Sequence, residues 1–337
     1  MNTGRTTGTV VKNPKGQAAR ANRPPDGAVR SVAVCIPTYR RPASLDRLLQ
    51  AIAQQRFESA PHPRVRVIVI DNSPDGEGVR VCEDVSPTFP FPLSWATEPE
   101  PGVSETRNRA VRSAREPQGL VAFIDDDSYP CETWLEQMLA VEGAHDADVV
   151  SGPVEPEFET TPPAWMVRGG FYSRPRMATG TETGPLRAGN ILIRDSVFDS
   201  VAEPWFDPRM GLTGGEDFLF LSRAEAGGAT MVWADEAVVF ESVPSARVSV
   251  GWLLRRWYRL GTNASICERE LRPGISTMLI RLVKLGVRMF ASALALLVTW
   301  PSRIMRTRVL MSLALSAGML SGLFNVGYRE YDRKRTG

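Results

Sequence analysis

Cysteine and histidine are scarce in this chain of 337 residues, and none of the cysteines forms a CxxC pair. Structural zinc sites are built from closely spaced Cys and His ligands, so we expect no zinc site. Four scattered cysteines are typical of reduced thiols in a cytosolic setting. The residues concerned are Cys35, Cys82, Cys131, Cys267, His62 and His145.

An excess of either charge is also lacking, because 40 Lys and Arg face 38 Asp and Glu. A net charge of +2 gives no reason to expect nucleic acid as a partner. No apolar run stands near the N-terminus, so we expect no secretory signal. Residues 1–28 are polar, basic and rich in Gly and Pro, which predicts a disordered tail.

A glycine-rich dinucleotide fingerprint is missing as well. The sequence "PTYRRP" follows the first apolar run, where a Rossmann dehydrogenase has G-x-G-x-x-G. The chain is therefore not expected to be a nicotinamide-dependent oxidoreductase.

What is present is an alternation of short apolar runs and segments with helical periodicity. Strand, helix and strand follow one another, which predicts a mainly parallel α/β sheet. Further strands are expected at 148–154 and 188–194, and a helix after the glycine-rich turn near 214. Residues 155–187 show no period and predict a long loop. We assign 29–250 to this domain; the first strands are 31–37, 64–71 and 119–124, and the helices between and after them are 41–55, 102–116 and 131–143.

Acidic residues stand at the ends of the apolar runs. The stretch "FIDDDSYP" places Asp125, Asp126 and Asp127 directly after a buried strand, and Asp71 ends the preceding one. In open α/β sheets, ligands bind outside the carboxyl ends of the strands. These acids and the segment 37–39 are therefore predicted to meet in one crevice.

The spacing of the acids suggests a chemistry. Adjacent carboxylates repel one another unless a cation neutralises them, and Mg²⁺ or Mn²⁺ binds one or two carboxylates together with substrate phosphates. Arg107, near a helix start, is a candidate to bind a diphosphate. Each feature has a simpler alternative: a solvated turn for the Asp cluster, an Asx turn at Asp71, a surface arginine at 107, and helix-dipole charge at Glu216 and Asp217.

Taken in order, these motifs resemble family 2 glycosyltransferases with the GT-A nucleotide-diphospho-sugar transferase fold. The resemblance covers about 31–245 and is greatest to bacterial exopolysaccharide transferases of the succinoglycan type. The stretches that carry it are "VAVCIPTYRRPASLDRLLQAI", "VIVIDNSPDG", "GVSETRNRAV", "FIDDDSYP", "AGNILIR" and "GGEDFLFLSRAEAGG".

The resemblance implies a role for each matching position. The nucleotide would contact the first strand end, the second strand end, the next helix and the first acid of the triplet. Asp125 and Asp127 would hold Mg²⁺ or Mn²⁺, with Asp127 the direct ligand, and Asp217 of the Glu216-Asp217 pair would be the catalytic base. The residues assigned to the nucleotide are Pro37, Thr38, Tyr39, Asp71, Arg107 and Asp125.

The implied reaction is inverting, metal-dependent transfer of one sugar from a nucleotide sugar, UDP being the expected carrier. The acceptor would be a lipid-linked or glycan hydroxyl in cell-surface polysaccharide synthesis. Processive members carry Gln-x-x-Arg-Trp; here Arg256-Trp257 are present but Leu253 replaces the Gln, which argues against a polymer synthase. Arg256 and Trp257 are assigned to the acceptor side, with simple packing as the alternative. A membrane-attached nucleotide-sugar-binding protein without turnover is the alternative function.

The character of the chain changes after residue 250. Residues 289–300 and 309–327 carry no charge, and basic residues stand between them. We expect 251–337 to be helical and attached to the cytoplasmic face of the inner membrane by interfacial or re-entrant helices, which keep the arginines on one side. True spanning and a soluble helical hairpin are the alternatives.

Overall fold

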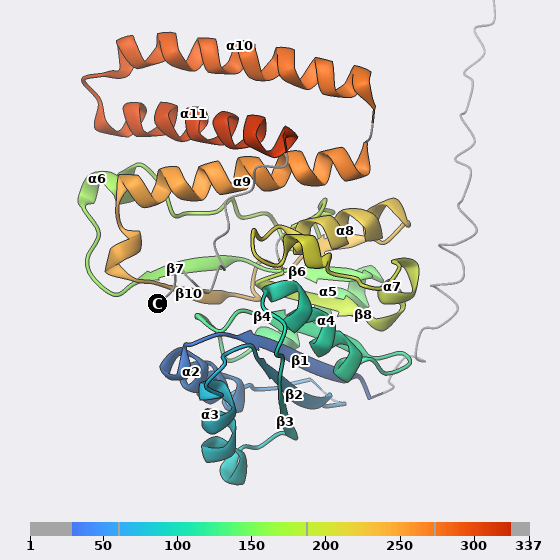
Figure 1. Cartoon of the computed structure of the whole chain (residues 1–337). Helices are drawn as coiled ribbons and strands as arrows, with labels where there is room; N and C mark the ends of the chain where they lie inside the picture. Colours follow the sequence, from blue (N-terminus) through green and yellow to red (C-terminus); the bar gives the residue numbers. More distant parts are fainter. Residues whose placement is uncertain (1–28, 60, 187, 273, 325–337) are drawn as a thin grey trace, which may run out of the picture.

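The computed structural model describes residues 29–59, 61–186, 188–272 and 274–324 (Figure 1). The disorder predicted for 1–28 and the basic C-terminal end after 324 lie outside the described residues.

A seven-stranded sheet forms the centre of the molecule, in the order β3-β2-β1-β4-β8-β6-β9. β8 runs antiparallel to both of its neighbours, and every other neighbouring pair is parallel. The mainly parallel sheet predicted from the sequence is thus confirmed. The strands are β1 (Ser31–Thr38), β2 (Arg64–Asp71), β3 (Leu93–Thr97), β4 (Leu120–Ile124), β6 (Val149–Ser151), β8 (Asn190–Arg194) and β9 (Met231–Trp233).

Helices cover both faces of this sheet. Alternate residues of β1 point to opposite faces: Val32, Val34 and Ile36 belong to one apolar core, and Ala33 and Cys35 to the other. A strand buried on both faces needs a continuous apolar run, which is what the sequence has there. The first core includes α2 (Pro42–Ala53), α3 (Glu77–Val85) and α5 (Trp134–His145); the second includes α4 (Val103–Ala114), α7 (Asp195–Ser200) and α8 (Glu216–Ala226).

A second, three-stranded sheet has the order β5-β10-β7. It consists of β5 (Ser128–Pro130), β10 (Val239–Val243) and β7 (Val154–Phe158). β7 and the short helix α6 (Ala164–Arg168) occupy part of the segment that we expected to be a loop. β7 is held by pairing with β10, far away in the sequence, and such pairing leaves no local periodicity.

Three long helices form layers on one side of the sheet domain: α9 (Val250–Leu271), α10 (Ile275–Thr299) and α11 (Arg303–Leu323). Figure 1 shows α11 between α9 and α10, with α10 outermost. α9 and α11 meet at glycines: a Cβ on Gly318 would lie 1.9 Å from the carbonyl oxygen of Tyr258, and one on Gly261 would lie 2.0 Å from that of Leu315. Only glycine permits this backbone approach.

Candidate functional site

A pocket of about 620 Å³ lies at the carboxyl ends of the parallel strands. Its walls come from the ends of β1 and β4, the first turns of α4 and α8, and one face of α9. Nine of the eleven site residues predicted from the sequence line it: Pro37, Thr38, Tyr39, Arg107, Asp125, Asp127, Glu216, Asp217 and Arg256. A pocket of this size is typical of small-molecule and cofactor sites.

The side chains of the three consecutive acids after β4 lie in different places. Asp125 and Asp127 line the pocket, whereas Asp126 is buried. Asp126 accepts hydrogen bonds from Thr38 Oγ1 (2.9 Å) and the backbone NH of Tyr39 (3.1 Å), and pairs with Arg41 at 2.6 Å. The middle acid therefore fastens the end of β1 to the end of β4, a role that the sequence analysis did not assign to it.

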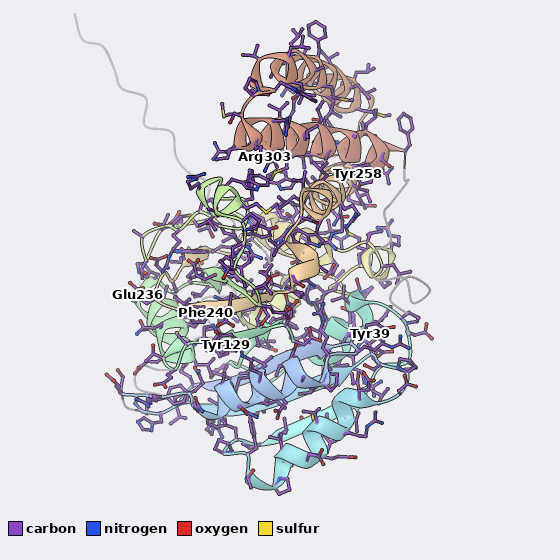
Figure 2. All side chains as sticks on the ribbon, turned by 90° about the vertical axis from the view of Figure 1, so that its left-hand side faces the viewer. Tyr39, Tyr129, Glu236, Phe240, Tyr258 and Arg303 are labelled. Carbon is purple, nitrogen blue, oxygen red and sulfur yellow. The ribbon has the colours of Figure 1, made fainter. Side chains whose placement is uncertain are left out.

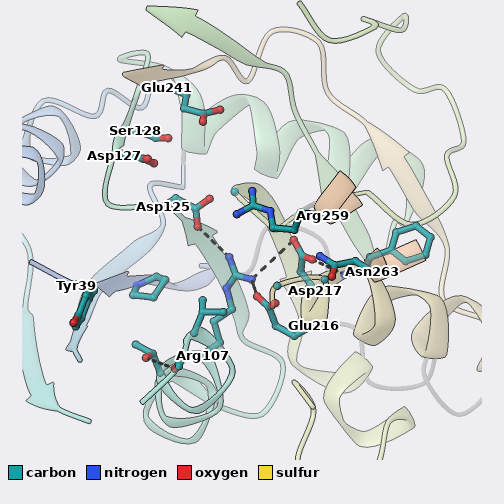
Figure 3. Close-up of a pocket in the computed structure, with 18 of the residues that line it drawn as sticks. Tyr39, Arg107, Asp125, Asp127, Ser128, Glu216, Asp217, Glu241, Arg259 and Asn263 are labelled. Atoms are coloured by element: carbon teal, nitrogen blue, oxygen red, sulfur yellow. Dashed lines mark hydrogen bonds and ion pairs between the residues drawn. The ribbon is translucent and has the colours of Figure 1, made fainter. Parts of the chain in front are cut away.

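Arg107 on α4 lies among three carboxylates. Its guanidinium donates to Glu216 and to Asp125 (3.0 Å), and lies 3.9 Å from Asp217 (Figure 3). Its side chain is only 6% exposed. In this arrangement Arg107 supplies the positive charge that holds the acids of β4 and α8 together.

Burial changes the protonation of these acids. It raises the pKa of Glu216 to about 7; Arg107 opposes the rise, and Asp217 adds to it. Desolvation also raises the pKa of Asp125 to about 6, with Arg107 lowering it and Asp127 raising it. Asp125 still has 43% of its side chain open to the pocket. Burial thus disfavours the charged forms of both acids, and a cation close to either carboxylate would favour its ionised form.

The Gly-Gly turn before α8 sets the direction of Asp217. Gly214 and Gly215 have φ values of 80° and 93°, in the region that L side chains rarely adopt. The turn leaves Glu216 buried against Arg107 and places Asp217 on the pocket wall. Asp217 accepts a hydrogen bond from the backbone NH of Ala188 at 3.0 Å, so its carboxylate is held in position.

Asp125 and Asp127 suit a hard divalent cation. Both offer carboxylate oxygens to the same pocket. Burial is the main cause of the raised pKa of Asp125, and the nearby Asp127 carboxylate adds to it. Guanidinium groups stand against Asp127, with Arg41 at 3.1 Å and Arg247 at 3.3 Å. Within the described ranges, no three His, Cys, Asp or Glu side chains form a metal-binding group. The chain thus offers two carboxylates, which is enough for Mg²⁺ when substrate phosphates and water complete its ligands.

Asp71 does not line the pocket. Its carboxylate is fully buried and accepts hydrogen bonds from the backbone NH groups of Ser73 (2.7 Å), Gly78 (2.8 Å) and Val79 (3.2 Å). Those bonds fix the turn after β2 and the start of α3, as in the Asx-turn alternative. The next residue, Asn72, lines the pocket instead, and nothing in the sequence distinguished the two positions.

Trp257 is also outside the pocket. It packs against an apolar cluster that contains Leu253 and Met311. Trp252 takes its place on the wall, with the guanidinium of Arg256 5.0 Å from its ring centre. The residues of α9 that line the pocket include Trp252, Arg256, Arg259, Leu260, Asn263 and Cys267. They recur every three or four positions, so helical periodicity would have selected 252 rather than 257.

The sequence model described as "Glycosyl transferase family 2" matches residues 33–201. The chain belongs to this family. It is 30% identical over 303 residues to "Succinoglycan biosynthesis protein ExoM" of Rhizobium meliloti, covering 90% of this chain and 94% of the relative. "Glycosyltransferase AglE" of Haloferax volcanii is 23% identical over 230 residues, covering 68% and 71%. The predicted family and a glycosyltransferase activity are confirmed.

Solved structures show the same fold. The mannosyltransferase PcManGT from Pyrobaculum calidifontis, in complex with GDP-Man and Mn²⁺, superposes with a TM-score of 0.61 at 19% identity, over 93% of this chain and 94% of that one. GalNAc-T7, with UDP, GalNAc and Mn²⁺, gives 0.51 at 11% identity, over 71% and 51%. The predicted GT-A fold is confirmed.

Proposed function

We propose that this family 2 glycosyltransferase moves one sugar from a nucleotide-sugar donor to an acceptor hydroxyl, with inversion and with the help of Mg²⁺ or Mn²⁺. One observation carries the proposal: Asp125 and Asp127, from the end of β4, share a single pocket with Asp217, from the start of α8. A cation site and a base on separate walls suit a displacement in which the diphosphate leaves from one side.

The donor occupies the side formed by β1 and β4 in this proposal. Pro37, Thr38, Tyr39 and Asn72 surround the nucleotide, and Asp126 keeps the first strand end in place. Asp127, with Asp125, would hold the ion, which when bound neutralises charge on the departing diphosphate. The Mn²⁺ and GDP-Man in the Pyrobaculum structure support this assignment.

Asp217 is the general base of the proposal. Its carboxylate is fixed by Ala188 and faces the pocket, where it takes the proton of the acceptor hydroxyl as that oxygen attacks the anomeric carbon. Glu216 holds Arg107, which in turn holds Asp125. Glu216 and Arg107 are thus positioning residues that keep the ion site and the base in register.

The acceptor enters along α9, where Arg256 and Trp252 line the wall. We propose a lipid-linked or glycan acceptor in cell-surface polysaccharide synthesis at the cytoplasmic face of the inner membrane, with UDP as the first carrier to test. The name of the Rhizobium relative supports such a pathway.

The test is a panel of UDP-, GDP- and dTDP-sugars with Mn²⁺, Mg²⁺ or EDTA, assayed for nucleoside diphosphate release and for the anomeric configuration of the product by NMR. We expect one donor to be consumed only with metal and with an acceptor present, giving an inverted linkage. Tight donor binding without release, under every acceptor and metal condition, would instead support a binding protein without turnover.

A further inference from the structure

The outer face of α10 is an apolar stripe. Eight large apolar side chains lie on it, each between 51% and 82% exposed. At 100° per residue they fall within one sector about 100° wide, running the length of the helix. We call this set the α10 stripe: Leu279, Ile280, Val283, Val287, Phe290, Leu294, Leu297 and Val298.

The opposite face of α10 rests on α11. Leu285 and Ser292 are buried there, and the Oγ of Ser292 lies 3.3 Å from that of Ser312. Arg288 Nε also donates to Ser312 Oγ, at 3.2 Å. Both views show α10 as the outermost layer (Figures 1 and 2), so the stripe points away from the rest of the described chain.

The charges on α10, on α11 and on the connection between them have one sign. Residues 271–324 contain seven Lys or Arg and no Asp or Glu. Lys284 and Arg288 are exposed on α10 beside the stripe, and Arg303 is exposed where the next helix begins. An apolar stripe bordered by cations matches a bilayer surface with anionic head groups. A second copy joined through the same stripe would bring these like charges together.

We propose that α10 docks the enzyme onto an anionic lipid bilayer, lying in the plane of the interface with its stripe in the head-group and acyl boundary. The segment Met278–Thr299 is long and apolar enough to cross a membrane. Arg288 stands at the middle of that segment, however, and is bonded to α11. Spanning would move its charge into hydrocarbon and remove its partner, whereas in-plane docking keeps both.

Docking through α10 also sets the distance between the bilayer and the pocket. α9 lines the pocket through Arg256 and Asn263 and meets α11 through Gly261, on its opposite side. α10, α11 and α9 therefore separate the bilayer from the pocket by two helix spacings, about 20 Å in total. This consequence rests on the proposed function: a lipid-borne acceptor must extend about that far from the membrane to meet Asp217.

The experiment is cosedimentation of the purified full chain with vesicles of phosphatidylcholine, alone or mixed with phosphatidylglycerol. The test variant is Val283→Glu with Leu297→Glu. Val29→Glu is the matched control, since Val29 is an exposed valine (47%) outside the helical layers. We expect the unaltered chain and the control to bind the anionic vesicles, and the double variant to bind about ten-fold more weakly or worse. Lys284→Gln should weaken binding to the vesicles that contain phosphatidylglycerol and leave binding to pure phosphatidylcholine vesicles unchanged.

Equal binding by the double variant and the control, with unchanged circular dichroism, would overturn the proposal. Absence of binding by the unaltered chain would also overturn it. A dimer that forms without lipid and that the double variant dissociates would overturn it too, because the stripe would then bind a second copy of the chain. Extraction of cell membranes with alkaline carbonate should release the protein, and retention would indicate a spanning helix. None of these readouts requires turnover, so failure here is distinct from failure of the proposed reaction.

Discussion

Arg107 on α4 and Glu216 at the start of α8 form a buried ion pair at the floor of the pocket. Their side chains are 6% and 3% exposed. Because Arg107 also reaches Asp125 at the end of β4, a single guanidinium connects the strand that carries the proposed ion site to the helix that carries the proposed base.

Replacing Arg107 should therefore be costly. Arg107→Gln leaves Glu216 and Asp125 without their shared cation, and removing one partner of a buried pair costs about 3–5 kcal/mol. Arg112→Gln is the control on the same helix, because Arg112 pairs with Glu203 at the surface, where both side chains are about half exposed. Urea unfolding measures both variants. Equal, small losses would show that the buried pair does not hold the site together.

Stability should depend on pH through Glu216. Its pKa rises from 4.5 to about 7 on folding, so between those values the folded protein holds a proton that the unfolded chain has released. The free energy of unfolding therefore falls as pH rises through this window. Glu216→Gln removes that contribution. The Tm of the variant minus the Tm of the unaltered protein should therefore increase as the pH is raised from 4.5 to 7. Glu83→Gln, an exposed change on α3, should show a constant difference; a flat profile for both would contradict the account.

Neighbouring acids should have separable roles. Asp127→Asn should weaken the metal dependence of donor binding and lower Tm less than the change at position 126, because Asp127 faces the pocket and its contacts with Arg41 and Arg247 are only weakened. Asp126→Asn should lower Tm and keep the metal dependence, since Asp126 bonds Thr38 and Tyr39. Titration of donor with and without Mn²⁺, beside thermal unfolding, measures both. The reverse pattern would place the ion on Asp126.

The glycines of the helical layers should respond in opposite ways. A Cβ on Gly318 collides with the backbone of α9, so Gly318→Ala should cost about 1–3 kcal/mol or more. Gly286, on α10, has nothing within 4 Å of such a Cβ, and Gly286→Ala should gain up to about 1 kcal/mol from helix propensity. Chemical unfolding measures the free energy of unfolding of both variants. No change in either variant would contradict the close packing of α9 on α11.

Apolar runs and helical spacing in the sequence predicted those elements that such short patterns define. The apolar run of β1 and the spacing of Leu45, Leu48, Leu49 and Ile52 predict a buried strand and an amphipathic helix, and both are present. β3 was not predicted, because "LSWAT" is a half-buried strand without a clear alternation. β7 was missed because only its pairing with β10 makes it a strand.

The site was predictable in composition and less so in detail. Residue type and order placed Asp125, Asp127 and Asp217 at strand and helix ends, and the fold brings them into one pocket. The sequence offered no way to distinguish Asp71 from Asn72, since the conformation of the turn after β2 decides which of the two side chains reaches the pocket. The pairing of Arg107 with Glu216 joins residues 109 positions apart, and only tertiary packing shows it.

Asp217 is the most direct test of the proposed mechanism. The measurement compares donor affinity and transfer rate for Asp217→Asn and the unaltered enzyme, with the donor found in the panel and its metal present. Loss of a general base should lower the transfer rate about 10²–10⁴-fold, while donor affinity stays within a few-fold. A variant that transfers sugar at the unaltered rate would contradict the assignment of Asp217 as the base.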